Sequence, residues 1–337
     1  MAGIASCLLG LGYLIGLNWF GEEGAFLGLM AAGVLWLILF CTAFFSGDSV
    51  LLKSAGARPI TREMHPQLYN IVEEMKIASG LTAMPAIYII DEPWLNAFAT
   101  GTSPSKSSVV VTAGLLSRLN RDELQGVIAH EMSHVMNQDV LYMTMAAVSL
   151  GAAQLVSQIF IRGHWYSGSS RRYRSSSSSK GGGGGQGALL AVTFLFVILA
   201  PILIRLFYFS LSRKREYLAD ACAARLTRYP EGLASALEKI SGSATAPLQP
   251  NAVTAPMYIH SPALESSSLF GTHPPAQKRI AILRAMTQGV SYADYQKSYE
   301  KVFGKAAHII PPGALHNSEA VPVREPSSAP LAPKPDA

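Results

Sequence analysis

Long apolar stretches alternate with short mixed segments along this chain. Ala2 to Phe20 and Gly24 to Phe45 contain no charged residue, and the turn between them holds Glu22 and Glu23. Because about 20 apolar residues cross the hydrocarbon core of a bilayer, the two stretches predict a transmembrane hairpin. A secretory signal peptide is the alternative for the first stretch, but it lacks a basic start and a second span follows at once.

Two further apolar stretches lie in the middle of the chain. Val140 to Ile161 is interrupted by Gln154 and Gln158, whereas Ala188 to Ile204 is strongly apolar. The connection between them, Arg162 to Gly187, is rich in Ser and Gly and contains basic but no acidic residues, so we expect a flexible, solvated loop. Translocating it opposes the positive-inside tendency. Full crossing and shallow embedding of these two stretches therefore both stay open.

The overall composition and the position of basic residues agree with a membrane protein. Only 15% of residues are charged and 49% are hydrophobic, against about 25% charged in an average soluble domain. Lys53 and Arg58 follow the second stretch and Arg213 to Arg215 follow the fourth, which predicts that these flanks face the cytoplasm. The net charge of +5 lies largely beside the spans and in the loop, so it gives no case for a nucleic-acid partner.

The segments between the apolar stretches carry helical and strand patterns. Pro66 to Ser79 places Leu68, Ile71, Val72 and Met75 on one helical face before Gly80. The other predicted elements are strands at Ala86 to Ile90, Leu95 to Thr100 and Ser108 to Thr112, and helices at Pro230 to Ile240, Pro275 to Met286 and Tyr292 to Val302. The pattern indicates an α+β domain built from two separated pieces of sequence.

His130-Glu131-Met132-Ser133-His134 is the strongest chemical signal in the chain. Residues four apart lie on one face of a helix, so both imidazoles can reach one metal ion, and Glu131 then lies beside the ion as a general base for a zinc-bound water. Asn120 followed by Glu123 resembles a capping box and places the motif inside a helix. The pattern predicts one catalytic Zn²⁺ per chain.

A catalytic zinc needs a third protein ligand, for which Glu216 is the candidate. Asp220 follows four residues later on the same predicted helix, where it would hold a ligand imidazole through its ring N–H. The alternative is that both acids pair with Arg213, Lys214 and Arg215 on a solvated face.

These motifs occur in an order that resembles the HtpX-type membrane metallopeptidases, which are related to the CAAX prenyl endopeptidases. The resemblance spans from the first residues to about Met286. The matching elements are the N-terminal hairpin, Asn96-Ala97-Phe98-Ala99-Thr100-Gly101, the HEMSH helix with Asp139 after it, two apolar segments, Glu216 with Asp220, and Thr272-His273-Pro274-Pro275 leading to Arg279.

The resemblance implies a fold, an activity and further site residues. The fold would be a zincin-like α+β metallopeptidase domain integrated with about four transmembrane or membrane-embedded helices. The activity would be that of a zinc endopeptidase of a bacterial inner membrane, multi-pass, which removes misfolded or damaged membrane proteins. Asn96, Ala97, Phe98 and Ala99 would form the edge strand that pairs with substrate. His273 and Arg279 would stabilise the oxyanion, or alternatively only cap and pair around a helix start at Pro275.

The chain is thereby divided into five parts. They are the hairpin of residues 1–47, a first catalytic part of residues 48–139, the two apolar segments of residues 140–210 with the insert 162–187, a second catalytic part of residues 211–309, and a disordered Pro-rich tail of residues 310–337. A prenyl-protein processing endopeptidase is the alternative function, although four apolar segments are few for the enclosed chamber that it needs. A membrane scaffold with structural zinc is a third reading, and Glu131 argues against it. The three cysteines, Cys7, Cys41 and Cys222, predict no disulfide.

Overall fold

The computed structural model describes residues 2–147, 213–243, 259, 274–304, 309–316, 319 and 321–326. The chain divides into two compact units. The first contains residues 1–46 and 145–208, and the second contains residues 47–144 and 209–337. Each unit is described by itself.

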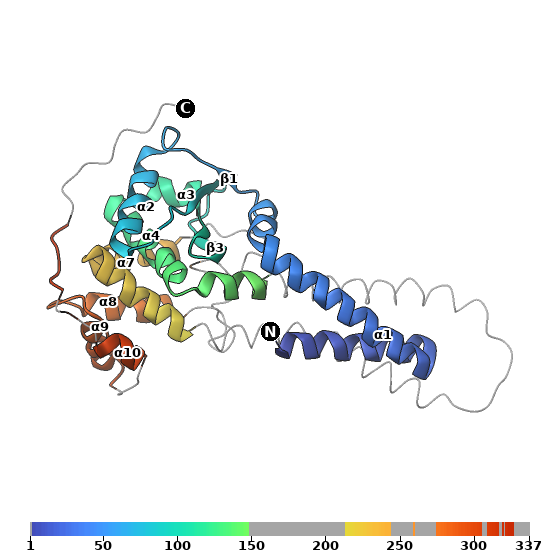
Figure 1. The fold of residues 1–337 in the computed structure, drawn as a ribbon. Helices are drawn as coiled ribbons and strands as arrows, with labels where there is room; N and C mark the ends of the chain where they lie inside the picture. The colour runs from blue at the N-terminus through green and yellow to red at the C-terminus, as the bar shows by residue number, and fades with distance from the viewer. Residues whose placement is uncertain are drawn as a thin grey trace. The chain divides into compact units, whose positions relative to one another are not determined.

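The first unit contains the N-terminal hairpin, which lies within α1 (Ala2–Ser54). At Gly21 the backbone is not helical (φ 71°, ψ −155°), and the chain folds back there (Figure 1). The two legs touch through glycines: a Cβ added to Gly12 would lie 2.5 Å from the carbonyl oxygen of Gly28, and one added to Gly16 would be closer still to that of Gly24. Small residues four apart on each leg thus let the backbones approach, as in membrane helix pairs.

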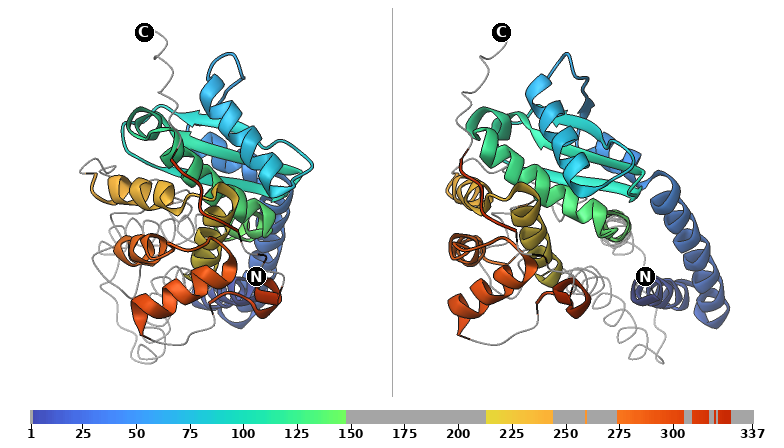
Figure 2. Two further views of the ribbon diagram at one scale, coloured as in Figure 1. Left: turned by 90° about the vertical axis from the view of Figure 1, so that its left-hand side faces the viewer. Right: turned by 60° about the vertical axis from the view of Figure 1, so that its left-hand side comes forward.

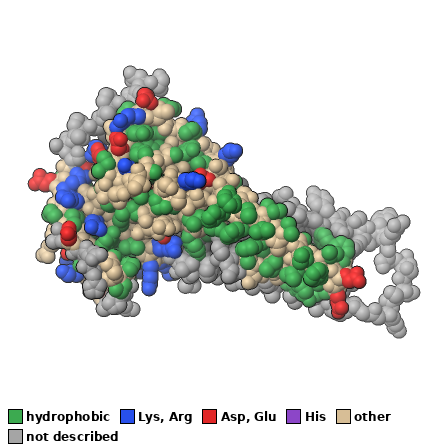
Figure 3. All heavy atoms as spheres, viewed as in Figure 1, with side chains coloured by type: hydrophobic (Ala, Val, Ile, Leu, Met, Phe, Trp, Pro, Cys, Tyr) green, Lys and Arg blue, Asp and Glu red, His purple; other side chains and the backbone are tan. Residues whose placement is uncertain are grey.

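The hairpin exposes apolar side chains. Phe20, Phe26 and Phe45 are 73%, 63% and 76% exposed, and green side chains cover this part of the surface in Figure 3. Within the described residues, one helix, Ala5–Ser54, is long and apolar enough to cross a membrane. It contains both predicted N-terminal spans. Of the other two predicted segments, only residues 140–147 are described, and these are helical; the insert 162–187 lies outside the described residues.

The second unit contains a four-stranded sheet with the order β1-β2-β4-β3. The strands are β1 (Arg58–Pro59), β2 (Ala86–Ile90), β3 (Ala97–Ser103) and β4 (Lys106–Thr112). β2 and β4 pair in parallel, and the other neighbours are antiparallel. β2 has the predicted bounds, whereas β3 starts two residues later than predicted and extends to Ser103. A tight turn at residues 104–105 joins β3 to β4, so both strands reach it.

Helices pack on this sheet and on one another, and the C-terminal ones lie beyond α4 from the sheet (Figure 2). They are α2 (Pro66–Ser79), α3 (Ala113–Arg118), α4 (Arg121–Met136), α7 (Pro230–Ser241), α8 (Ala276–Arg284), α9 (Tyr292–Phe303) and α10 (Pro312–His316), together with helical residues 139–147 and 213–227. α2 has the predicted bounds because Pro66 opens it and Gly80, in the left-handed conformation, closes it.

α4 is the central helix of the second unit. The predicted capping box is present: the Asn120 side chain accepts from the backbone N–H of Glu123, and the Glu123 carboxylate accepts from that of Asn120. Every residue from Glu123 to Val135 is buried, as expected for a helix enclosed on all sides. α7 crosses it closely, because a Cβ on Gly126 would lie 2.6 Å from the backbone nitrogen of Leu233.

Part of the Pro-rich tail is ordered, which differs from the disorder expected for residues 310–337. Pro312–His316 forms α10. Within residues 321–326 of the second unit, the Arg324 guanidinium donates to Asp122, Gln125 and the Thr227 carbonyl. The Pro-rich composition does not indicate this contact, because a single arginine holds the segment and no apolar pattern marks it.

Candidate metal centre

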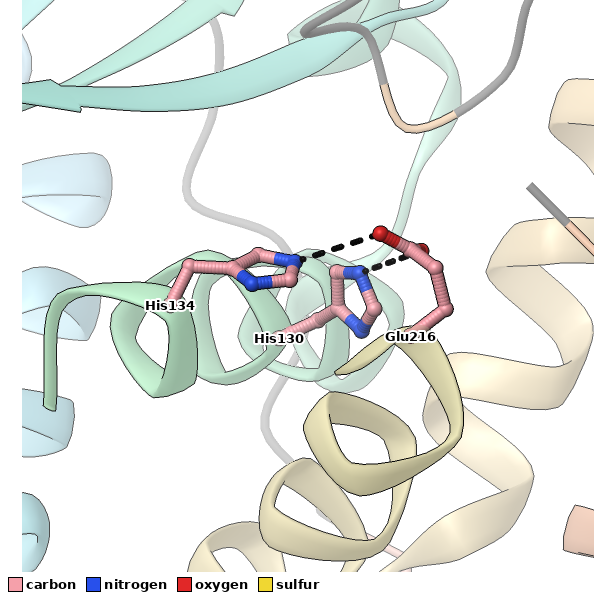
Figure 4. A group of neighbouring side chains, drawn as sticks. All are labelled: His130, His134 and Glu216. Atoms are coloured by element: carbon pink, nitrogen blue, oxygen red, sulfur yellow. Dashed lines mark ion pairs between the residues drawn. The ribbon is translucent and has the colours of Figure 1, made fainter. Parts of the chain in front are cut away.

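Three buried side chains from two helices converge in the second unit. His130 and His134 project from α4, and Glu216 projects from the helix of residues 213–227 (Figure 4). One ligand atom of each lies within 4.8 Å of the other two, and all three side chains are buried. This is the group that the sequence predicts as metal ligands.

The separations fit a small tetrahedral ion. His130 Nε2 lies 3.5 Å from Glu216 Oε2, and His134 Nε2 lies 3.6 Å from Glu216 Oε1. Two ligands at ~2.1 Å from a tetrahedral Zn²⁺ are ~3.4 Å apart. The donors are therefore spaced to share one such ion, and two imidazoles with one carboxylate are a usual donor set of catalytic zinc.

Asp220 and Arg279 hold His130 from behind. His130 Nδ1 lies 3.0 Å from Asp220 Oδ1, which leaves Nε2 toward Glu216. Arg279, from α8, donates through Nε and Nη2 to the two Asp220 oxygens at 2.8 and 2.6 Å. Burial opposes ionisation of Asp220, but the charge and hydrogen bonds of Arg279 outweigh it and keep the pKa of Asp220 below its usual value.

Asp139 and Arg215 lie against His134 in a similar way. Asp139 Oδ2 is 3.1 Å from His134 Nδ1, and Asp139 Oδ1 is 3.0 Å from Arg215 Nη1. In both histidines, Nδ1 thus faces an aspartate and Nε2 faces Glu216.

The charges of this region favour a divalent cation. Glu131, Glu216, Asp139 and Asp220 are buried, and Arg215 and Arg279 balance two of these four carboxylates. A net charge of −2 remains when all four are ionised, and a bound divalent cation would neutralise it.

The neighbouring carboxylates also raise the pKa of His130. Burial lowers this pKa, but hydrogen bonds to Asp220 and Glu216 outweigh the burial and raise it to about 9. The donor set and its electrostatics fit Zn²⁺ or a similar ion.

The amino-acid sequence of this chain is similar to those of known proteins. The chain matches the model of peptidase family M48 over residues 63–287, which include every ligand and both arginines. The chain belongs to peptidase family M48. It is a metallopeptidase.

Two relatives illustrate how far the similarity to M48 proteins extends. "Protease HtpX homolog" of Dictyoglomus turgidum is 45% identical over 262 residues, which cover 77% of this chain and 82% of the relative. The protein of the same name from Dictyoglomus thermophilum is 46% identical over 266 residues, covering 79% and 84%. The crystal structure of S. mikatae Ste24p aligns with a TM-score of 0.45 at 19% identity, over 80% of this chain and 60% of that one.

The structure describes the position of each predicted M48 site residue except His273. Glu131 follows His130 on α4 and is 2% exposed. Arg279 is 1% exposed and is held by Asp220, with Nη1 3.6 Å from Glu216 Oε2. His273 lies outside the described residues, so the predicted pairing of His273 and Arg279 at an oxyanion stays a prediction.

The resemblance included Asp139 without a role, and the sequence suggested Arg215 only as a possible partner of Glu216 and Asp220 on a solvated face, whereas Tyr295 was not singled out. Tyr295, from α9, is fully buried, and its pKa is raised well above the usual value, first by burial and next by the charge of Asp220. The sequence predicted the helix that carries Tyr295, but its burial depends on how α9 packs, which no local pattern reports.

The predicted substrate strand is the edge strand of the M48 sheet. Ala97, Phe98 and Ala99 belong to β3, and Asn96 directly precedes it. The Asn96 carbonyl accepts from the backbone N–H of Thr112, so Asn96 faces β4. Because orientation alternates along an antiparallel strand, Ala97 and Ala99 direct their backbone groups to the outer edge.

Two contacts already occupy part of that edge. The backbone N–H of Ile259 donates to the Ala97 carbonyl at 3.1 Å, and that of Gly101 donates to Thr144 Oγ1 at 3.3 Å. Ala99 lies between them and is itself fully buried. Ile259 and Thr144 therefore engage the outer edge of β3 on either side of Ala99.

Proposed function

We propose that this chain is a membrane-bound, zinc-dependent endopeptidase that cleaves misfolded or damaged membrane proteins on the cytoplasmic side of a bacterial inner membrane. The observation that carries the proposal is the spacing of His130, His134 and Glu216, which suits one tetrahedral ion. The apolar hairpin supports the membrane location. The name of the relatives supports the class of enzyme.

His130 and His134 would hold the ion through Nε2 and Glu216 through its carboxylate. When bound, Zn²⁺ supplies a Lewis acid that polarises the scissile carbonyl and lowers the pKa of a water molecule to about 7. Asp220 would accept a hydrogen bond from His130 Nδ1–H, which leaves the Nε2 lone pair for the ion.

Glu131 would act as the general base. It follows His130 directly on α4, so its carboxylate lies about 100° around the helix from that ligand. From there it would accept a proton from the attacking water and return it to the leaving amide nitrogen. Burial of Glu131 to 2% exposure strengthens its interactions with charge that develops during the reaction.

The substrate would enter as an added strand along β3. Ala99 is the residue whose N–H and C=O both face the outer edge between the Ile259 and Thr144 contacts. A strand pairs through main-chain groups, so this mode accepts many sequences but requires an extended chain. Unfolded segments of membrane proteins satisfy this requirement, and folded domains do not.

Replacing Glu131 with Gln tests the proposal on purified full-length protein in detergent, with unfolded casein as the substrate. E131Q should lose at least about 100-fold in turnover, as expected for loss of general base catalysis, while metal analysis still finds one zinc per chain. H134A should lose both activity and zinc. Glu92→Gln makes the same chemical change at an exposed position and should keep both. Full activity of E131Q, or zinc-free wild-type protein that still cleaves casein, would refute the mechanism.

A further inference from the structure

The surroundings of His134 contain a second aspartate and arginine whose role the sequence did not indicate. The Asp139 carboxylate contacts His134 Nδ1 at 3.1 Å with one oxygen and Arg215 Nη1 at 3.0 Å with the other. The side chains of His134 and Asp139 are only 3% and 7% exposed. Arg215 is 36% exposed, and its guanidinium lies 4.8 Å from the ring centre of Tyr142.

A special turn brings Asp139 to the histidine. On one continuous helix, residues five apart point about 140° away from each other, so Asp139 could not face His134. α4 instead ends at Met136, and Gln138 adopts the left-handed conformation with φ 58° before helical residues 139–147 begin. The change of direction at Gln138 turns the Asp139 carboxylate back toward the ring.

Arg215 connects this aspartate to the third ligand. It directly precedes Glu216 at the start of the helix of residues 213–227. Neighbouring residues on a helix diverge by about 100°, so Glu216 reaches the two histidines while Arg215 reaches Asp139. One short stretch thus both supplies a ligand and neutralises the carboxylate that holds another ligand.

We infer that Asp139 and Arg215 form a positioning pair for His134. Asp139 accepts a hydrogen bond from Nδ1–H, which fixes the ring and directs the Nε2 lone pair to the metal position. Arg215 acts through Asp139: its guanidinium lies against the second carboxylate oxygen and thereby holds the carboxylate in its orientation. This inference rests on the proposed zinc site and adds two residues that set its affinity.

Zinc affinity tests the pair independently of catalysis. The dissociation constant is measured on full-length protein in detergent by competition with a chromogenic chelator. Loss of such a partner typically weakens metal binding by about 10- to 100-fold, which is the effect expected for D139A. R215Q should weaken binding less, and the double variant D139A/R215Q should bind no more weakly than D139A, because Arg215 acts on His134 through its contact with Asp139.

Controls separate positioning from general effects. Lys214→Gln removes the neighbouring, exposed positive charge and should leave zinc affinity unchanged. Asp139→Asn keeps an acceptor for Nδ1 and should bind zinc more tightly than D139A; it also carries the test if D139A fails to fold. The absorption spectrum of the Co²⁺-loaded protein should shift in D139A and not in K214Q, since it reports ligand geometry rather than stability.

Defined results would overturn the inference. They are unchanged zinc affinity in D139A and D139N, equal losses in R215Q and K214Q, or additive losses in the double variant. A different result would contradict the proposed function itself: wild-type protein that binds no zinc.

Discussion

The two histidines of the site are held by aspartates that reach them by different routes. Asp220 follows Glu216 by four residues, so one helical face carries both to His130. Asp139 follows His134 by five residues and reaches it only through a left-handed turn. Each histidine has an aspartate at Nδ1. Helical periodicity places Asp220 there, whereas an interruption of the helix at Gln138 places Asp139 there.

The two aspartates also differ in the burial of their arginines. The side chain of Arg279 is 2% exposed and binds Asp220 through two nitrogens, whereas that of Arg215 is 36% exposed and meets Asp139 through one. A fully buried pair cannot lose one member without stranding the other charge, but a half-exposed arginine can be hydrated. We therefore expect the Asp220 side to carry stability and the Asp139 side to tune metal affinity.

The largest effect is expected from Arg279→Ala, which strands the buried Asp220. Removing one partner of a buried ion pair costs about 3–5 kcal/mol, so the melting temperature in detergent should fall sharply. Arg284→Ala is the matched control: its ion pairs with Glu231 and Glu238 are exposed, and such pairs contribute at most about 1 kcal/mol.

Turnover of the Arg279 variant decides between two roles. The sequence predicted that Arg279 stabilises an oxyanion together with His273, in which case Arg279→Ala would fold with normal stability and lose kcat alone. Normal melting with reduced kcat would therefore support that role and contradict the structural one.

The sequence predicted what depends on periodicity. His130, His134, Glu216 and Asp220 all follow from spacings of four residues on helices, and the bounds of α2 follow from Pro66 and Gly80. These features depend on residues close together in the chain, so a single sequence is enough to predict them.

What the sequence did not predict depends on tertiary contacts. Gln138 carries no Gly or Asn signal for a left-handed turn, so the approach of Asp139 to His134 was hidden. The contact between Arg324 and Asp122 joins residues 202 positions apart, and no local pattern reports such a distance. The apolar segments Val140 to Ile161 and Ala188 to Ile204 are predicted by hydropathy, and their residues after 147 lie outside the part of the chain that the structure describes.

A middle-sized effect is expected from Arg324→Ala, at the end of both ligand helices opposite the metal. Arg324 joins them by donating to Asp122 and Gln125 of α4 and to the Thr227 carbonyl, and it lies 5.1 Å from the Tyr229 ring centre. A hydrogen bond to a charged group contributes about 1.5–3 kcal/mol, and 29% exposure of Arg324 places the expected loss near the lower end.

Thermal melting of the Arg324 variant tests the tail contact. Lys297→Ala removes an exposed cation of α9 and should leave the melting temperature unchanged. Equal melting of both variants and the wild type would mean that residues 321–326 add nothing to the stability of the two ligand helices.

The smallest effect is expected at Gln138, where the two routes to the histidines differ most directly. Left-handed backbone costs a residue with a side chain about 1–2 kcal/mol, and Gly avoids this cost but adds freedom to the unfolded chain. Gln138→Gly should therefore stabilise the protein by at most about 1 kcal/mol, while Gln67→Gly within α2 should destabilise it by up to about 1 kcal/mol. Gln138→Val should instead lower both stability and zinc affinity, because a β-branched residue resists φ 58° and moves Asp139 away from His134. A Gln138→Val protein that binds zinc as tightly as the wild type would show that the turn does not position the histidine, and the two aspartates would then differ in burial alone.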